Sequence, residues 1–189
     1  MDLILVRHGE IPSNIKRVYA GRSPEYLTDR GIRQAEEVSA RLSNLNIDVI
    51  YTSPIRRAVQ TAEIINAQLN VALEINNAFR ELEMGPWEGM SETDVAREYP
   101  EEWDTWNKRP AELRLPGRET LDELLRRVIS GIQGLYLEKE RKHAVLVTHV
   151  AIIRVILLWK AGKDLNLYKT IHVPNVATFT VSLDTMPCL

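Results

Sequence analysis

The sequence predicts an α/β domain in which helices cover a mainly parallel sheet. Short apolar runs bounded by glycine or proline alternate with longer segments whose apolar residues recur at helical spacing. The clearest runs are residues 3–6 and 143–148, and both are almost entirely apolar, as expected for strands covered on both faces. The 189 residues are enough for one domain with a substantial core. We therefore expect a single domain over residues 1–189.

The first half of the chain is predicted to contain three strands and two helices. The first strand ends at Arg7-His8-Gly9, and a polar loop follows over residues 10–26. Thr28 is a candidate N-cap of a helix. The apolar residues on one face of that helix are Ile32, Ala35, Val38, Leu42 and Leu45. The other expected elements of this half are a strand at 48–52, a helix at 54–69 and a strand at 71–75.

The second half begins with a segment of looser pattern, residues 79–118, which is rich in proline and glycine. Short helices are expected near 92–98 and 101–107, and three of the four tryptophans fall in this segment. Because binding loops concentrate around active sites, we interpret it as an insertion that covers the active edge of the sheet. The elements expected after it are a long amphipathic helix at 119–141 containing Gly131 and Gly134, a strand at 143–148, a helix at 150–161 and an edge strand at 176–183.

Composition excludes several classes of protein. A formal charge of −2 gives no basic face for nucleic acid. The one cysteine, Cys188, allows no intrachain disulfide or thiolate metal cluster, which fits a reducing compartment. The N-terminus lacks a signal-peptide pattern, and the apolar run 150–159 is interrupted by Arg154 and too short to span a membrane. We expect a cytoplasmic enzyme-sized domain that binds neither nucleic acid nor membrane.

Two of the predicted strands end in a histidine. His8 follows Arg7 after the first strand, and His149 follows the strand at 143–148. Because parallel strands end at the same edge of a sheet, the two imidazoles are expected to converge there. The strand at 48–52 runs through Ser53 into a helix whose first turn carries Arg56 and Arg57. An arginine fork suits phosphate and a neutral histidine can attack phosphorus, so these strand ends predict a phosphate site. Of the two arginines, we expect Arg57 to face it.

Four motifs and the second histidine together resemble the histidine phosphatase superfamily, also called the phosphoglycerate mutase-like family. The matching segments are residues 7–10 with Asn14, residues 27–35, residues 53–62 with Arg57 at the functional arginine, residues 80–89 with Glu81 at the proton donor, and His149. The resemblance covers nearly the whole chain. It implies a three-layer αβα sandwich whose mostly parallel sheet has an antiparallel edge strand.

The resemblance also implies a mechanism without metal or cofactor. His8 would attack phosphorus to form a phosphohistidine, and Glu81 would protonate the leaving oxygen and then help activate water. The groups that would bind and neutralise the phosphoryl group are Arg7, Asn14, Arg57 and His149. Glu83 is a competing acid, and we expect it to point to the opposite face from Glu81.

Two positions depart from the family pattern: Ile11 replaces the usual threonine, and Val150 replaces the glycine that commonly follows the second histidine. These departures bear on substrate and efficiency and leave the proposed catalytic groups in place. A metal site is not expected, since no H-E-x-x-H motif or carboxylate cluster accompanies the histidines and the neighbouring arginines would repel a divalent cation.

The sequence favours a phosphatase acting on a small phosphorylated metabolite, because a mutase of this family has a longer chain and more covering sequence. Phosphoglycerate mutase-type phosphoryl shuttling remains open, as does a phospholigand-binding module with little turnover. A homodimer is compatible with the sequence. Arginines of the covering segment are candidates for a second anionic group of the substrate, although solvated surface positions are the commoner fate of such residues: Arg109, Arg114 and Arg118.

Overall fold

The fold is known from a computed structural model that describes residues 1–138 and 141–184. Cys188 lies outside the described residues. The sheet has five strands in the order β3-β2-β4-β1-β5, and only β5 runs antiparallel to its neighbour. The strands are β1 (Asp2–Arg7), β2 (Val49–Thr52), β3 (Ala72–Ile75), β4 (His143–Thr148) and β5 (Thr178–Ser182). The mostly parallel sheet with an antiparallel edge strand is therefore confirmed.

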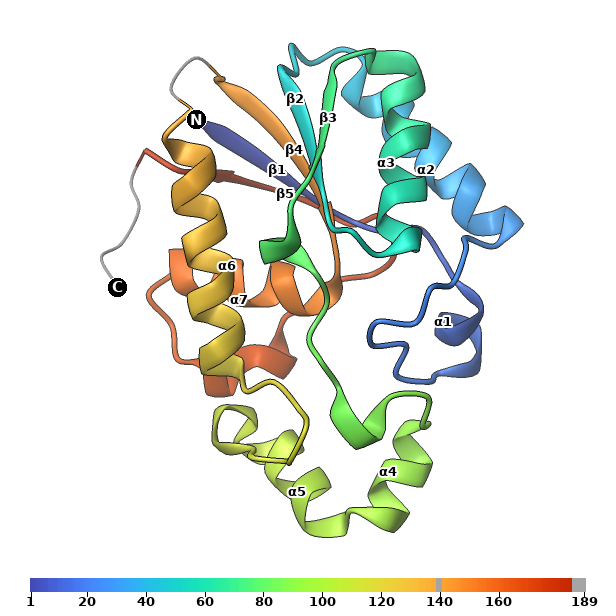
Figure 1. Ribbon diagram of the computed structural model, residues 1–189, viewed down its shortest axis with the longest axis vertical. Coiled ribbons are helices and arrows are strands. Elements are labelled where there is room, and N and C mark those ends of the chain that lie inside the picture. The colour runs from blue at the N-terminus through green and yellow to red at the C-terminus, as the bar shows by residue number, and fades with distance from the viewer. Residues whose placement is uncertain (139–140, 185–189) are drawn as a thin grey trace.

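Helices cover both faces of the sheet (Figure 1). On one face, α2 (Asp29–Leu42) and α3 (Arg56–Leu69) bury their apolar side chains against Ile4, Ile50 and Val145. On the other face, α6 (Leu121–Tyr136) and α7 (Val150–Lys160) pack against Leu5, Tyr51 and Leu146. Alternate residues of β1, β2 and β4 thus enter two separate cores, which gives the predicted three layers.

Local sequence signals account for where the long helices begin. Thr28 caps α2 by accepting a hydrogen bond from the amide of Gly31 at 3.0 Å, as the sequence predicts. Thr120 and Glu123 form a reciprocal capping box at the start of α6. Gly31 also lies so close to the strand end that a Cβ there would meet the carbonyl oxygen of Glu10 at 2.3 Å. A glycine at this position therefore allows α2 to start directly beside the residues that follow β1.

The structure corrects four details of the sequence prediction. The polar loop at 10–26 contains a short helix, α1 (Pro12–Lys16), which is too short to show periodicity. The predicted helix at 54–69 begins at Arg56 instead, because Pro54 lies before its first turn. Leu45 lies beyond the end of α2 and is 48% exposed. The helix predicted to reach residue 141 ends at Tyr136, and it runs without a break through both of its glycines.

The segment 79–118 folds into α4 (Glu92–Glu98), α5 (Pro100–Lys108) and short 3-10 turns, below the sheet in the view of Figure 1. Trp87 is fully buried at its centre. The rings that pack around it, with centroids 6.1–6.4 Å away, are Tyr19, Tyr99, Trp103 and Trp106. These aromatic contacts tie the segment to the loop that follows α1. Among the described helices, none is long and apolar enough to cross a membrane.

Candidate active site

The two strand-end histidines lie together. Since β1 and β4 are parallel neighbours with Arg7 opposite Thr148, the next residues of both strands, His8 and His149, also face each other, and their ring centroids are 5.3 Å apart. Both side chains are buried. The Nδ1 of His8 is 2.7 Å from the carbonyl oxygen of Gly9. This carbonyl can only accept a hydrogen bond, so the proton of the neutral ring resides on Nδ1 and the lone pair on Nε2.

His149 is oriented by Ser53, which follows β2. The Nε2 of His149 is 2.7 Å from Oγ of Ser53, and the same oxygen accepts the amide hydrogen of Ile55 at 3.2 Å. Among the described residues the Ser53 hydroxyl hydrogen has no other acceptor, and we therefore assign it to a hydrogen bond with Nε2. The proton of neutral His149 is then on Nδ1, which is buried and has no hydrogen-bond partner among the described residues. This N–H is available as a donor to a ligand.

Arg57, in the first turn of α3, extends into the site and is 1% exposed. Its Nη groups donate to the carbonyls of Gly21 (2.7 Å) and Ser23 (3.1 Å), and its Nε donates to Nε2 of His8 at 3.2 Å. Arg56 is exposed and lies over the ring of Tyr26. The structure therefore brings Arg57 and not Arg56 to the histidines.

Arg7 approaches from the end of β1. Its Nη1 donates to the carbonyl of Val173 at 2.6 Å, which fixes the guanidinium beside the pocket, and its buried Nε has no hydrogen-bond partner among the described residues. Together with Arg57, this guanidinium supplies positive charge around His8. The unsatisfied N–H is a donor that a phosphate oxygen would satisfy.

Glu81 and Glu83 lie in different environments. Glu81 lines the pocket and is 8% exposed, with its Oε1 accepting the amide hydrogen of Leu82 at 2.8 Å. Glu83 points away, where its half-exposed carboxylate pairs with Arg22 at 2.9 Å. Strand alternation does not explain this separation, because residues two apart in an extended segment share a face. Residues 80–84 form no helix or strand, and this irregular backbone between two 3-10 turns places the first carboxyl, and not the second, in the pocket.

Asn14, from α1, completes the wall of the pocket. Its Oδ1 accepts from the amide of Ile11 (3.2 Å) and from Nδ2 of Asn175 (2.9 Å), so its own NH₂ group is left as a donor. Asn175, which the sequence analysis missed, also donates to the carbonyl of His8 at 3.1 Å. The next residue, Val176, has φ +54°, a strained conformation for a β-branched residue. The fold maintains this strain beside the residue that anchors the His8 backbone.

The departures at Ile11 and Val150 leave the site intact. Ile11 is fully buried, and its amide is bound by the Asn14 side chain in place of any threonine hydroxyl. Val150 begins α7 and lines the pocket, and it is not among the residues with positive φ. Since the backbone there is helical, a Cβ fits without strain.

Burial shifts the pKa values of the titratable groups of the site. The pKa values of both histidines lie well below the usual value. The larger cause is loss of hydration on burial, and the second is the positive charge of the neighbouring Arg57. Both rings are therefore neutral at pH 7. Loss of hydration also lowers the pKa of Arg7 to about 10, which leaves it charged at neutral pH. Burial raises the pKa of Glu81, although the nearby Arg57 opposes this rise. The site thus combines a neutral nucleophile, fixed cations and a carboxyl group that tends to hold its proton.

The cavity has a volume of about 220 Å³, below the roughly 300–1,000 Å³ of sites for drug-sized ligands. Its lining includes residues that the sequence analysis did not assign to the site: Tyr19, Arg154, Tyr168 and Lys169. Arg154 had one signal in the sequence, as the single charge inside the apolar run 150–159. The other three lie in loops or 3-10 turns, where no periodicity marks them.

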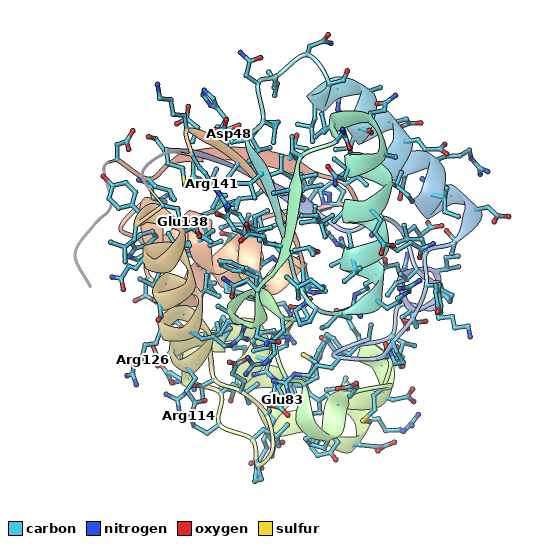
Figure 2. All side chains as sticks on the ribbon, turned by 45° about the horizontal axis from the view of Figure 1, so that its top comes forward. Asp48, Glu83, Arg114, Arg126, Glu138 and Arg141 are labelled. Carbon is cyan, nitrogen blue, oxygen red and sulfur yellow. The ribbon has the colours of Figure 1, made fainter. Side chains whose placement is uncertain are left out.

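The arginines of residues 79–118 do not line this cavity. Arg118 is buried between Trp87 and Trp106, with its guanidinium 5.2 and 4.2 Å from the ring centroids. Arg109 pairs with Glu112 and is 60% exposed. Arg114 pairs with Asp122 at the outer edge of the molecule (Figure 2). Arg109 and Arg114 are thus surface arginines, the fate that the sequence favours, and Arg118 is buried away from the cavity, so none of the three binds a second anionic group there. Across residues 1–138 and 141–184, no group of three His, Cys, Asp or Glu side chains could hold a metal ion.

Comparison with known proteins gives a consistent set of relatives. The chain is 30% identical over 188 residues to phosphoserine phosphatase 1 of Hydrogenobacter thermophilus, covering 97% of this chain and 87% of that protein. Its fold matches YhfR of Bacillus stearothermophilus with a TM-score of 0.92 at 23% identity, covering 98% and 92% of the two chains. It also matches a mutant of phosphoserine phosphatase from Entamoeba histolytica, in complex with phosphoserine, with a TM-score of 0.83 at 25% identity and coverage of 95% and 89%.

The sequence model of the histidine phosphatase superfamily (branch 1) matches residues 3–186. A match over this length, together with the relatives above, identifies the family that the sequence motifs resemble. The chain belongs to the histidine phosphatase superfamily and is a phosphoric monoester hydrolase.

Proposed function

We propose that this enzyme hydrolyses a small phosphomonoester in two steps through a phosphohistidine on His8. The observation that carries the proposal is the geometry of this residue. Its Nδ1–H is held by the carbonyl of Gly9, so the nucleophilic lone pair is on Nε2, beside the guanidinium of Arg57. A neutral imidazole next to fixed positive charge is the arrangement that an in-line attack on a phosphate dianion requires.

In the first step, Nε2 of His8 forms a bond to phosphorus while the ester P–O bond breaks. Glu81 donates its proton to the departing oxygen, so the product is a neutral alcohol and the carboxylate remains. The cations Arg7 and Arg57 and the Nδ1–H of His149 bind the equatorial oxygens, and Asn14 adds its amide hydrogens. Binding of phosphate replaces the hydrogen bond between Arg57 and His8, which frees the lone pair for attack.

In the second step, water attacks phosphorus and the P–N bond breaks. The carboxylate of Glu81 accepts the proton of the water, which restores the acid form, and His8 returns to the neutral state with inorganic phosphate released. Burial raises the pKa of Glu81 toward neutral pH, and this direction suits a group that first gives a proton and then takes one back. No step requires a metal ion or cofactor, and the proposal is a metal-independent hydrolase.

Relatives named as phosphatases of phosphoserine and α-ribazole support hydrolysis of a small phosphorylated metabolite. Phosphoglycerate mutase-type transfer is the alternative within the family. The cytoplasmic location, the homodimer and the single domain with a covering insertion at about 79–118 stay predictions.

The test is an assay of phosphate release from a panel of phosphomonoesters, with and without EDTA. We expect turnover that EDTA leaves unchanged. Isomerisation of 3-phosphoglycerate without release of phosphate would replace the hydrolase by a mutase. Absence of turnover across the panel, with tight binding of the esters, would make the protein a phospholigand-binding module. Loss of activity in EDTA that added divalent metal restores would overturn the metal-independent mechanism.

A further inference from the structure

Glu81 lies on a segment that has no regular structure of its own. Residues 80–84 connect two 3-10 turns, η1 (Asn77–Phe79) and η2 (Gly85–Trp87). Such a segment lacks the repeated backbone hydrogen bonds that fix a strand, so its position depends on contacts with other parts of the chain. The hydrogen bond from the amide of Leu82 to Oε1 of Glu81 is internal to the segment and cannot place it against the sheet.

One side chain of α6 holds both the start of this segment and the turn before it. Arg127 donates from Nη1 to the carbonyl oxygens of Ala78 (2.7 Å) and Arg80 (3.0 Å). Gly131 lies four residues after Arg127, on the same face of the helix. It approaches η1 so closely that a Cβ there would meet the Cβ of Ala78 at 2.5 Å. This close approach of α6 allows the guanidinium to reach the backbone directly before Glu81.

The carboxylate of Glu119 holds the other end of the segment. Its Oε2 accepts the amide hydrogen of Glu83 at 3.4 Å, and the amide of Glu119 donates to the carbonyl oxygen of Glu83 at 3.0 Å. The same carboxylate binds Arg127 through two bonds, with Nε–Oε1 and Nη2–Oε2 distances of 2.8 and 2.7 Å. The two side chains are nearly buried, 13% exposed for Arg127 and 10% for Glu119. An ion pair with this geometry has a fixed orientation and is poorly screened by solvent.

A further contact comes from the sheet. Thr148, the last residue of β4, donates from Oγ1 to the carbonyl oxygen of Phe79 at 2.8 Å. Because His149 follows Thr148, this bond ties the turn before the segment to the strand end that carries the second histidine. The chain is thus held on both sides of Glu81, by carbonyl groups before it and by the residue two positions after it.

We propose that the ion pair between Arg127 and Glu119 positions Glu81 for transfer of its proton to the departing oxygen. The inference rests on the proposed function, in which Glu81 is the general acid. Neither member of the pair lines the cavity, so both act through the backbone and are positioning residues. A general acid must lie within hydrogen-bond reach of the oxygen that it protonates, and a displacement of about 1 Å can lower a rate about 10²-fold. Loss of the pair should therefore impair proton donation and leave the binding of phosphate intact.

The test uses two esters that differ in their need for the acid. The alkoxide of glycerol 3-phosphate must be protonated, whereas the nitrophenolate of 4-nitrophenyl phosphate leaves without a proton. Arg127→Met and Glu119→Met should each lower kcat/KM for glycerol 3-phosphate by about 10- to 100-fold. Both variants should change kcat/KM for 4-nitrophenyl phosphate by less than about threefold, which also shows that they fold. Arg126→Met changes an exposed arginine beside Arg127 on α6 (Figure 2), and this matched control should behave as wild type toward both esters.

Two double variants separate positioning from loss of stability. Removal of one partner leaves the other charge nearly buried and unpaired, which is costly, so Arg127→Met/Glu119→Met replaces both charges at once. This variant should show the same selective loss for glycerol 3-phosphate. In Glu81→Gln/Arg127→Met, the second substitution should cause less than about threefold further loss, because the group that Arg127 positions is already gone.

The single variants also separate positioning from an effect of charge. Arg127 and Glu119 carry opposite charges, so an action through their electric fields would give opposite effects on kcat/KM for glycerol 3-phosphate. Positioning predicts a loss in both variants. Opposite effects would overturn the inference, as would a full further loss from Arg127→Met in the Glu81→Gln background.

The outcomes distinguish a failure of this inference from a failure of the proposed function. If Glu81→Gln shows the selective loss for glycerol 3-phosphate and Arg127→Met/Glu119→Met does not, the positioning role is wrong and the hydrolase mechanism stands. If Glu81→Gln lowers kcat/KM equally for both esters, the proposed acid role is wrong and the inference falls with it.

Discussion

Replacing Glu81 by glutamine removes the proposed proton donor with little change in shape. The side chain is buried, and its Oε1 accepts the amide hydrogen of Leu82 at 2.8 Å. A glutamine can keep that hydrogen bond through its own Oε1 and has almost the same volume. Glu81→Gln therefore tests the dissociable proton, and the fold and the binding of phosphate should be retained.

The expected size of the effect follows from the chemistry of the departing group. Burial raises the pKa of Glu81, which favours the protonated carboxyl that delivers the proton. A positioned general acid contributes about 10²–10⁴-fold, and we expect kcat/KM for glycerol 3-phosphate to fall by that factor, or about 3–5 kcal/mol. Nitrophenolate leaves without a proton, so kcat/KM for 4-nitrophenyl phosphate should fall by less than about tenfold.

The assay measures kcat/KM for both esters as a function of pH. Activity toward glycerol 3-phosphate requires protonated Glu81, so it should decline as pH rises through the raised pKa of this group, and Glu81→Gln should lack that decline. On the acid side, the lowered pKa of His8 should keep the nucleophile unprotonated, and activity should persist below pH 6.5. Glu83→Gln is the control, because Glu83 pairs with Arg22 outside the cavity, and it should behave as wild type.

Two results would refute the reasoning. Equal losses for the two esters in Glu81→Gln would mean that the carboxyl group does not protonate the departing oxygen. A large loss in Glu83→Gln with little change in Glu81→Gln would transfer the role to the competing acid.

Two further predictions concern orientation and packing. Ser53→Ala removes the hydrogen-bond donor to Nε2 of His149. One unsatisfied buried group costs about 1–3 kcal/mol, so we expect kcat/KM to fall about 5- to 150-fold. The ¹⁵N chemical shifts of His149 should report loss of the Nδ1–H tautomer. Unchanged shifts would show that the serine does not set the tautomer. Gly131→Ala places a Cβ 2.5 Å from the Cβ of Ala78, and it should lower the free energy of unfolding in urea by about 1–3 kcal/mol. Gly134, on the same helix, faces open space, so Gly134→Ala should raise the free energy of unfolding by about 0.5–1 kcal/mol. Equal effects at the two glycines would contradict the close approach.

The sequence predicts those parts of the site that depend on strand order and register. His8 and His149 each follow an apolar strand, and parallel neighbours in register place their next residues side by side. The structure brings Arg57 and Glu81, the two residues chosen from the sequence, into the pocket. Arg56 is exposed, and Glu83 pairs with Arg22 outside it. The end of an apolar strand is a local property of the sequence, so one sequence is enough to locate the two histidines.

Features that depend on tertiary contacts were not predictable in this way. Ser53 contacts His149 from the end of the neighbouring strand β2, and Asn175 reaches His8 from a loop 167 residues away in the chain. Arg118 reads as a surface arginine, yet tryptophans that are distant in the chain bury it. Lys169 lies in a 3-10 turn without periodicity, so only the packing of α5 against that turn reveals its place in the cavity.

The central claim is that His8 carries the phosphoryl group, and the direct measurement is rapid quenching of the enzyme with ³²P-labelled ester into alkali. The account predicts a phosphoenzyme that is stable in alkali and labile in acid. It should form at least as fast as phosphate is released. Mass spectrometry should locate the phosphoryl group on the peptide that contains His8. His8→Ala should form none and have no turnover. Full turnover of His8→Ala, or a phosphoryl group mapped to another residue, would contradict the account.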